Sequence, residues 1–298
     1  MATSDQLLVV IDPVARHCDG EAVRIAKDVL SARAATKVCL PDGPEEFARA
    51  LDRRGSRRPV VVGDDRALLR AVTLLHRRRE LGTTALALVP VGAALSLART
   101  LGVPTGPVAA ARAVLDGAER RLDLLADDSD GVVLGELRIP SLPSVPSPRN
   151  GEHLGEEAAS ARPWLRMRQS LVRTLARPPR LTSPHPLGPS RLRIEVDGVT
   201  LVDLNQPVTG VSVTPDSSGT AVVEVRPLSV GAEASPLAAR GRTVTVSGAD
   251  FRYRADAVVS GPVRHRTWTV WEGAWVLTVP VSDCRPDATR SSDPLTGS

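Results

Sequence analysis

The sequence predicts two parts: an N-terminal α/β domain with a parallel sheet, and a β-rich C-terminal domain of antiparallel, sandwich-like type. Three observations lead to this prediction. Short apolar runs alternate with helical patterns over about residues 7–125, prolines and serines interrupt the pattern near residue 140, and apolar and polar residues alternate beyond Ser190. The first pattern is typical of a helix-covered parallel sheet, and the last is typical of antiparallel strands.

The apolar runs of the first part have the length and composition of buried parallel strands. Each run is followed by a segment with the helical spacing of apolar residues, as in Glu21–Leu30 after the first run. Parallel strands need such crossover helices, so the runs together predict one parallel sheet. The predicted strands are Leu7–Ile11, Thr36–Leu40, Pro59–Val62 and Thr84–Val89.

Changes of composition give the expected domain boundaries. We expect a nucleotide-binding-type α/β domain over residues 1–128 and a Pro/Ser-rich and acidic insertion over 129–162. A basic helix and the β-rich domain follow over 163–284, and residues 285–298 have the composition of a frayed tail.

Two segments of the second part carry more specific expectations. Pro163–Arg177 has the pattern of a basic amphipathic helix bounded by prolines, which suits contact with an anionic membrane surface or packing against the protein's own β domain. Trp268, Trp271 and Trp275 flank Glu272 and Gly273, and this spacing predicts a hairpin whose tryptophans pack in the core or at a sheet edge.

The charge balance narrows the choice of partner only slightly. The formal net charge is +4 and the isoelectric point is about 9.5, with Lys27 and Lys37 the only lysines among 38 basic side chains. A basic protein attracts nucleic acid, nucleotide phosphates and anionic lipid headgroups alike, so charge does not choose among them. We expect no nucleic-acid partner. The histidines and cysteines do not have the spacing of metal ligands, so we expect no metal site built from them.

The expected location is the cytoplasm, with access to the periphery of a membrane. No apolar run approaches the roughly 18 to 20 residues of a membrane span, and Met1–Gln6 lacks the pattern of a secretion signal. Cys18, Cys39 and Cys284 are odd in number and far apart, which is typical of a reducing compartment.

The candidate site lies at the turns that follow the apolar runs. In open α/β sheets, ligands bind at the carboxyl ends of the strands, where backbone N–H groups and helix N-termini face anions. The turns after Ile11, Val62 and Val89 are therefore expected to meet at one edge of the sheet.

The residues around these turns carry a family resemblance. Leu88–Pro104 (LVPVGAALSLARTLGVP) and Val60–Leu68 (VVVGDDRAL) resemble the two phosphate-side loops of the soluble diacylglycerol kinase and lipid kinase family. Leu7–Pro13 (LLVVIDP) and Arg120–Leu124 (RRLDL) are similar to two further motifs of that family, in the same order.

This resemblance implies an NAD kinase/diacylglycerol kinase-like fold and ATP-dependent phosphorylation of a lipid hydroxyl. ATP and Mg²⁺ would be the cofactors of an active enzyme, and the implied partners are a nucleotide, an anionic membrane surface or lipid, and a second copy in a homodimer. By resemblance, Gly63, Asp65 and Gly92 are the nucleotide-binding candidates. No residue is singled out as the catalytic group.

The chain departs from the family pattern within both loops. In the first loop, Asp64 and Arg66 stand at glycine positions and Ala67 at a threonine position; glycine would otherwise permit close approach of the backbone to a phosphate. In the second loop, the positions of threonine, asparagine and aspartate hold other residues, namely Ala93, Leu95 and Ser96. The β-rich part departs too, because Ser218–Val222 and Val259–Pro262 stand where the family has D-G-x-L-D and V-D-G-E.

Two hypotheses of function follow. In the first, the chain is a lipid kinase of doubtful activity with an unusual site, in which Asp64, Asp65 and Asp123 supply carboxylates for Mg²⁺ while Gly92 and Arg99 approach phosphate. In the second, it is a non-catalytic nucleotide- or lipid-binding regulatory relative, a pseudokinase, with an eroded site.

The same residues also have purely local interpretations. Gly63 and Asp65 can form a strand-to-helix turn with a carboxylate near a helix N-terminus, and Gly92 can allow tight packing of a strand against a helix. Asp123 has the pattern of a solvated carboxylate at the end of a strand.

Overall fold

The computed structural model describes residues 6–140, 189–228 and 235–281. These residues lie in one compact unit that groups Met1–Ser141 with Pro189–Ser298. The predicted basic helix Pro163–Arg177 and the predicted tail 285–298 lie outside the described residues. The domain boundaries and the two interpretations of the basic helix therefore stay predictions.

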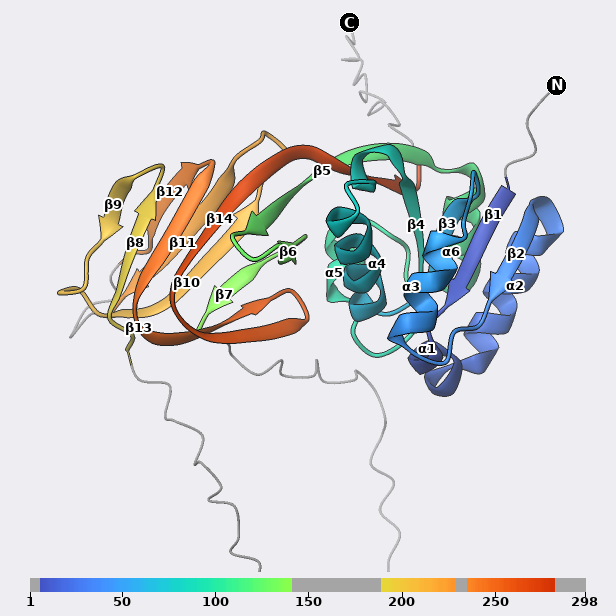
Figure 1. Cartoon of the computed structure of the whole chain (residues 1–298), viewed down its shortest axis with the longest axis horizontal. Coiled ribbons are helices and arrows are strands. Elements are labelled where there is room, and N and C mark those ends of the chain that lie inside the picture. Colours follow the sequence, from blue (N-terminus) through green and yellow to red (C-terminus); the bar gives the residue numbers. More distant parts are fainter. Residues whose placement is uncertain (1–5, 141–188, 229–234, 282–298) are drawn as a thin grey trace, which may run out of the picture. The chain divides into compact units, whose positions relative to one another are not determined.

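The N-terminal part alternates strands and helices, as predicted (Figure 1). Each of the four predicted strands is present, and every boundary lies within one residue of its prediction. In chain order the elements are β1 (Gln6–Ile11), α1 (Pro13–Cys18), α2 (Gly20–Arg33), β2 (Ala35–Cys39), α3 (Pro44–Asp52), β3 (Arg58–Gly63), α4 (Asp65–Arg77), the 3-10 turn η1 (Leu81–Thr83), β4 (Ala85–Pro90), α5 (Ser96–Thr100) and α6 (Pro107–Asp116).

These strands form the predicted parallel sheet. β1 pairs in parallel with β2 and β3, and β3 pairs in parallel with β4, which gives the order β4-β3-β1-β2. Alternate residues of β1 face two different cores: Leu7 and Val9 pack with α2 and α6, whereas Leu8 and Val10 pack with α3 and α4. β1, β3 and β4 are thus buried, with apolar cores on both faces of the sheet, which explains why they are continuous apolar runs. The edge strand β2 is mostly exposed and includes Lys37.

Aspartates and prolines mark the starts of the helices. Asp12, Asp19 and Asp64 are the N-caps of α1, α2 and α4, and each accepts a hydrogen bond from a backbone N–H of the helix it caps. Prolines stand in the first turn of α1, α3 and α6, where a backbone N–H has no partner within the helix.

The remaining strands build the β-rich part. Their pairings with one another are antiparallel throughout the described residues, which confirms the predicted fold class. These strands are β5 (Ala118–Asp127), β6 (Val132–Val133), β7 (Leu137–Ile139), β8 (Leu192–Val196), β9 (Val199–Val202), β10 (Val208–Pro215), β11 (Ala221–Pro227), β12 (Leu237–Gly241), β13 (Thr243–Ala255) and β14 (Val258–Val279).

The predicted tryptophan hairpin is wrong. Trp268, Trp271 and Trp275 all lie on the single 22-residue strand β14. Glu272 and Gly273 form an irregularity, since the register of β14 against β5 shifts between Trp271 and Trp275, and Gly273 has a φ of 54°. Glu272 and Gly273 therefore lie at a β-bulge. Gly273 adopts a left-handed backbone conformation there, and the strand continues beyond it.

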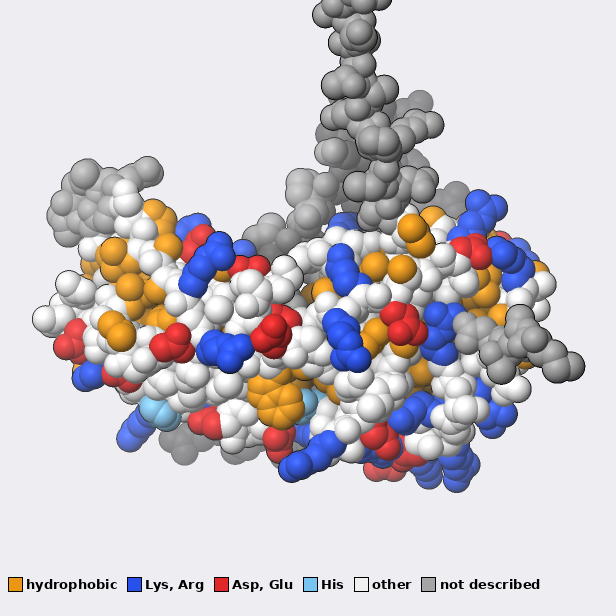
Figure 2. All heavy atoms as spheres, turned by 90° about the horizontal axis from the view of Figure 1, so that it is seen from above, with side chains coloured by type: hydrophobic (Ala, Val, Ile, Leu, Met, Phe, Trp, Pro, Cys, Tyr) orange, Lys and Arg blue, Asp and Glu red, His pale blue; other side chains and the backbone are white. Residues whose placement is uncertain are grey.

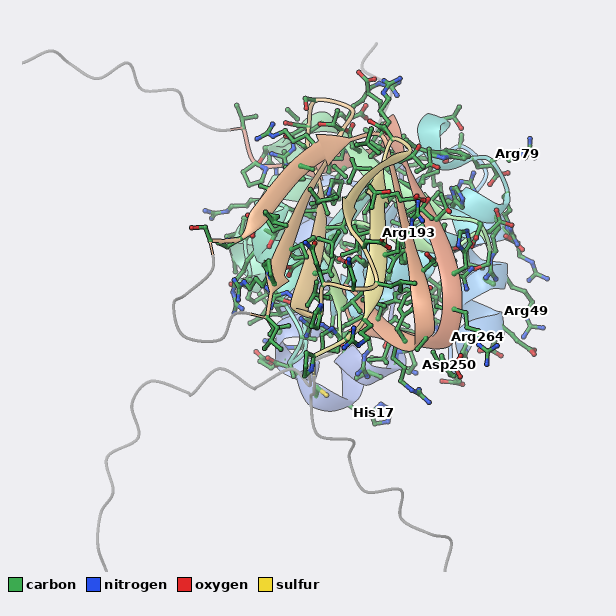
Figure 3. All side chains as sticks on the ribbon, turned by 90° about the vertical axis from the view of Figure 1, so that its left-hand side faces the viewer. His17, Arg49, Arg79, Arg193, Asp250 and Arg264 are labelled. Atoms are coloured by element: carbon green, nitrogen blue, oxygen red, sulfur yellow. The ribbon has the colours of Figure 1, made fainter. Side chains whose placement is uncertain are left out.

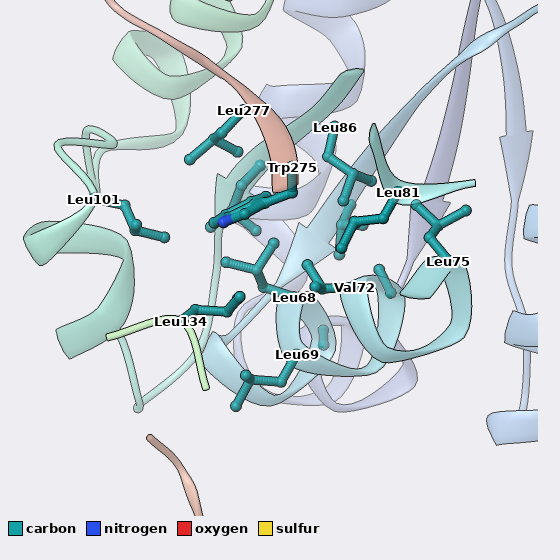
Figure 4. Close-up of a cluster of buried hydrophobic side chains, with 14 of the residues drawn as sticks. Leu68, Leu69, Val72, Leu75, Leu81, Leu86, Leu101, Leu134, Trp275 and Leu277 are labelled. Atoms are coloured by element: carbon teal, nitrogen blue, oxygen red, sulfur yellow. The ribbon is translucent and has the colours of Figure 1, made fainter. Parts of the chain in front are cut away.

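Strand β14 also joins the parallel sheet. Its residues Val276 and Leu277 pair in parallel with Ala85 and Leu86 of β4. Trp275 and Leu277 consequently enter the same core as α4, together with Leu68, Val72 and other residues labelled in Figure 4. The C-terminal strand thus completes a core that the N-terminal helices begin.

Two surface observations complete the description. None of the helices in the described ranges is long and apolar enough to cross a membrane. On the face drawn in Figure 2, basic side chains are interspersed with acidic ones instead of forming one continuous field.

We expect Trp271 and Trp275, which lie on opposite sides of the β14 bulge, to differ strongly in their contribution to stability. Trp275 is fully buried, so Trp275→Ala should lower the free energy of unfolding by about 3–5 kcal/mol through the cavity it leaves. Trp271 is 50% exposed and forms a T-shaped ring pair with His76, so Trp271→Ala should cost less than about 1.5 kcal/mol. Urea unfolding measures both. If Trp275→Ala does not fold, Trp275→Phe is measured instead. Equal losses of unfolding free energy at Trp271 and Trp275 would contradict the burial of Trp275.

Candidate functional site

The turns predicted to form the site do meet at the carboxyl edge of the parallel sheet. Backbone hydrogen bonds join them: Asp12 donates to the carbonyl of Val62 and Val91 to that of Gly63, each at 2.9 Å. The N–H of Asp65 donates to the carbonyl of Ala94, also at 2.9 Å. The structure therefore brings Gly63, Asp65 and Gly92 together, although these residues are up to 29 positions apart in the chain.

Asp64 occupies the N-terminus of α4. Its Oδ1 accepts hydrogen bonds from the backbone N–H groups of Arg66 at 3.1 Å and Ala67 at 3.2 Å. Burial raises the pKa of this carboxyl, the two N–H donors lower it, and the negative charge of Asp12 raises it further, so that the net shift is upward. The anion-binding end of the helix is thus filled by a side chain of the protein itself.

Asp65 caps a second helix. The residue is only 2% exposed, and its Oδ2 accepts hydrogen bonds from the backbone N–H of Leu97 at 2.9 Å and from the Ser96 hydroxyl at 3.1 Å. Its Oδ1 accepts from the N–H of Ala98 at 3.1 Å. Helix α5 has no side-chain cap from its own N-cap residue, Leu95, so Asp65 of α4 supplies the acceptor. Both oxygens of Asp65 are engaged in this contact.

The two candidate glycines are required by packing within the protein. A Cβ at Gly63 would lie 2.6 Å from the Cβ of Ala67 and 3.0 Å from that of Asp12. Gly92 has a φ of 131°, and a Cβ there would lie 3.1 Å from the Cβ of Asp64. The space next to each glycine is therefore occupied by side chains of the same site, and the φ of Gly92 is one that other residues rarely adopt.

Asp12 is a third carboxylate at this edge, and like Asp65 it is buried. It accepts a hydrogen bond from the N–H of Val14 at 2.9 Å and forms an ion pair with Arg70 of α4. The guanidinium of Arg70 in turn lies 5.4 Å from the centre of the Phe47 ring, which is within the range of a cation–π contact. These contacts connect the β1 turn with helices α3 and α4.

Asp123 on β5 connects three chain segments. Its Oδ2 accepts from the N–H of Gly219 at 2.8 Å, and its Oδ1 accepts from the N–H of Gly273 at 2.7 Å. The indole N–H of Trp275 donates to its carbonyl at 3.3 Å. The interpretation of Asp123 as a solvated carboxylate is wrong, because the side chain is buried and holds the β10–β11 turn against the bulge of β14.

Asp256, which the sequence analysis did not select, lies close to Asp65. Its carboxylate accepts hydrogen bonds from the successive N–H groups of Leu134 at 2.7 Å and of Gly135 and Glu136 at 2.8 Å. Burial raises its pKa against the effect of these donors, and the charge of Asp65 raises it further. Three such N–H groups form a nest that binds anions, and here the anion is a side chain of the protein.

The only signal for Asp256 in the sequence is its place in the turn between β13 and β14. Its φ is 49°, which aspartate tolerates better than most residues. A turn aspartate is usually exposed, however, so neither the partial burial of Asp256 nor its distant partners could have been predicted. Arg99, a predicted phosphate contact, is exposed on α5.

Comparison with known proteins identifies the N-terminal part. Residues 6–126 match the family model of the diacylglycerol kinase catalytic domain. These residues belong to the diacylglycerol kinase catalytic domain family. Kinases of this family use ATP and Mg²⁺, and membership implies nucleotide binding. Contact of Gly63, Asp65 and Gly92 with a nucleotide stays a prediction.

The whole diacylglycerol kinase-like fold recurs in solved structures. A diacylglycerol kinase from Bacillus anthracis str. Sterne is 12% identical, with a TM-score of 0.62 over 94% of this chain and 98% of that chain. Two more structures from the same strain, assigned the same activity, are 12% and 13% identical with TM-scores of 0.64, and cover 94% of this chain and 98% and 97% of theirs. At such identities the likeness concerns the fold alone. Among curated proteins, none matches this chain in sequence.

In this diacylglycerol kinase-like site, we expect Asp65 to be a structural cap. Asp65→Ala leaves the buried N–H groups of Leu97 and Ala98 without an acceptor and should cost about 1–3 kcal/mol of unfolding free energy. Ser96→Ala removes only the hydroxyl contact and should cost less than about 1 kcal/mol. Urea unfolding gives both values, and amide hydrogen exchange should be faster in α5 of the Asp65→Ala variant alone. Unchanged exchange there would contradict the cap.

We also expect acid to stabilise the wild type relative to an Asp256→Asn variant. The raised pKa means that folded Asp256 binds a proton at a pH where the unfolded chain does not. Its stabilising contribution is therefore full below the unfolded pKa of about 3.9 and is lost as the pH rises through the folded pKa. Urea unfolding of both proteins from about pH 7 down to about pH 4 should give a difference that grows in favour of the wild type. A difference independent of pH would contradict the raised pKa.

Proposed function

We propose that this chain is a non-catalytic member of the diacylglycerol kinase family, which keeps the fold as a nucleotide- or lipid-binding regulatory module and has lost phosphoryl transfer. The observation that carries the proposal is the Asp64 carboxylate on the N-terminus of α4. A phosphate bound at this point needs the same N–H groups and meets a like charge a few ångströms away. Family members with glycine at this position leave those groups open to the ligand, as the resemblance implies.

The carboxylates of the site give a second line of support. Mg²⁺ takes oxygen ligands in a near-octahedral arrangement, usually from one or two carboxylates, waters and substrate phosphates. Asp65 and Asp123 each accept hydrogen bonds on both oxygens from their own chain. A metal at either carboxylate would compete with these buried N–H donors for the same oxygens. The carboxylates of Asp65 and Asp123 therefore do not fit the ion, and we derive no step through it.

The side chains near the expected phosphate position add to this argument. Ala67 and Ala93 stand where the resemblance expects threonine, and Leu95 stands where it expects asparagine. Phosphoryl transfer depends on positioned donors and charges, and removing one such contact typically lowers turnover by about 10²- to 10³-fold. Several losses together leave a rate close to the background unless other groups replace them.

Turnover is the direct test. We expect no Mg²⁺-dependent transfer of radiolabelled phosphate from ATP to diacylglycerol in mixed micelles, or to other lipid alcohols, by the wild type or by Asp65→Asn. A diacylglycerol kinase of known activity serves as the positive control. Robust phosphorylation by the wild type that disappears in Asp65→Asn would overturn the proposal and make Asp65 a functional residue of an active lipid kinase.

A matched pair of cap variants tests the reason for the loss. Asp64→Gly frees the N–H groups of Arg66 and Ala67, whereas Asp19→Gly removes an equivalent cap from α2, outside the site. The loss of either cap should lower stability by up to a few tenths of a kcal/mol, since glycine is itself tolerated there. Addition of Mg·ATP should raise the melting temperature of Asp64→Gly by more than it raises that of the wild type, and Asp19→Gly should behave like the wild type. The reason is that a ligand that binds the native state stabilises the native state. A larger gain in the wild type than in Asp64→Gly would contradict the blocked N-terminus.

A further inference from the structure

A groove of about 450 Å³ lies on the α/β part, outside the turns of the kinase-like site. Lys37 and Cys39 of β2 line one wall. Glu46 and Arg49 of α3, with the C-cap residue Arg53, line the other. Leu8 of β1 forms the floor. It pairs with Lys37 in the neighbouring strand, so the two side chains lie on the same face of the sheet. None of Asp12, Gly63, Asp64, Asp65 or Gly92 contributes to this lining.

The groove follows from the sequence of two elements. β2 is the last strand in the order of the parallel sheet, so one of its edges has no strand partner among the described residues. Helix α3 turns Phe47 and Leu51 into the core, which directs the face carrying residues 46, 49, 50 and 53 toward β2. Ala50 is the small residue of that face, and its short side chain leaves space above Leu8.

The charge of the walls is unbalanced. Lys37, Arg49 and Arg53 face the single carboxylate of Glu46. Arg49 is paired with Glu46 at 3.6 Å, and it extends outward from α3 in Figure 3. No ion pair of Lys37 or Arg53 occurs within the described ranges. The groove thus presents an excess of cations to an anionic ligand, and an arginine fork matches phosphate or carboxylate oxygens well.

The rest of the lining is apolar. Leu8, Pro41 and Ala50 lie next to the thiol of Cys39, and Leu40 is an exposed large hydrophobic residue at 53%. A mostly apolar concave surface with a few charged groups is the composition of small-molecule sites, whose volumes run from roughly 300 to 1,000 Å³. The volume here is near the lower end of that range, which suits one hydrocarbon chain.

We propose that this groove binds a single-chain anionic amphiphile. Its phosphate or carboxylate head lies against Lys37, Arg49 and Arg53, and its hydrocarbon part lies on Leu8, Pro41 and Ala50. The proposal goes beyond the proposed function and does not depend on it, because the lining is separate from the kinase-like turns and binding here involves no phosphoryl transfer.

Cys39 allows the binding to be located. In a full-length Cys18→Ser/Cys284→Ser background, Cys39 is the only thiol, and its alkylation rate reports access to the groove. Dodecyl phosphate below its micelle concentration should slow this reaction saturably. Inorganic phosphate or dodecanol at the same concentration should not slow it, because each lacks one half of the ligand. Vesicles of phosphatidylcholine with phosphatidic acid distinguish membrane lipid from monomer and should leave the rate unchanged.

A matched pair of double variants separates the groove from general electrostatics. Lys37→Gln/Arg53→Gln should weaken dodecyl phosphate binding about tenfold or more, as expected for loss of charge-assisted hydrogen bonds. Lys27→Gln/Arg112→Gln removes the same charge from α2 and α6 and should stay within about twofold of the parent. The proposal is overturned by an absence of saturable protection of Cys39, by equal weakening in both variants, by protection with phosphate alone, or by protection with vesicles but not with monomer.

Discussion

The fold depends on strand β14, which connects regions far apart in the chain. Its 22 residues pair with β13, with β5 and, through Val276 and Leu277, with β4 of the parallel sheet. A strand with pairing on both sides is stable only when both neighbours are in place, because buried backbone groups need partners. The parallel sheet and the antiparallel strands are therefore mutually dependent. Asp123 secures the irregular point of this strand by accepting the N–H of Gly273 at the bulge, and with its other oxygen it holds the turn at Gly219.

The site is dominated by a second constraint, the pairing of buried carboxylates with backbone N–H groups. A buried carboxylate needs hydrogen bonds, and the first N–H groups of a helix need acceptors. Asp64, Asp65 and Asp256 satisfy both requirements at once by binding α4, α5 and the nest at residues 134–136. On the proposed function, the contacts that keep the turns in place occupy the groups with which a kinase would hold phosphate or metal. The fold of this family would then persist without its chemistry.

The edge of the parallel sheet is independent of that constraint. Lys37 stands on the edge strand β2, where a charged side chain also discourages pairing with a strand of another molecule. Because α3 is anchored by Phe47 and Leu51, its charged groove residues Glu46 and Arg49 can vary without disturbing the core. A ligand surface beside β2 can therefore be retained whether or not the turns after β1, β3 and β4 carry out a reaction.

Local pattern determined much of the architecture. The apolar runs and the helical spacing between them predicted the parallel strands to within one residue. β1, β3 and β4 gave the clearest signal, because a strand covered on both faces has to be apolar throughout. The turns at Gly63, Asp65 and Gly92 were predicted to meet for the same reason, since the carboxyl ends of adjacent parallel strands share one edge.

The roles of the individual side chains were decided by tertiary structure. The sequence by itself determined that Asp65 follows a strand and opens a helix, but its acceptor role for α5 depends on a segment about 30 residues away. The sequence could not place the three tryptophans on one strand either, because Glu-Gly is typical of turns. The bulge arises only when β14 pairs with β5. Asp123 and Asp256 were misjudged or missed since their partners lie 96 to 150 positions away for the first and 120 to 122 for the second. Such hydrogen bonds form only when folding brings the segments together, so periodicity and local propensity contain no signal for them.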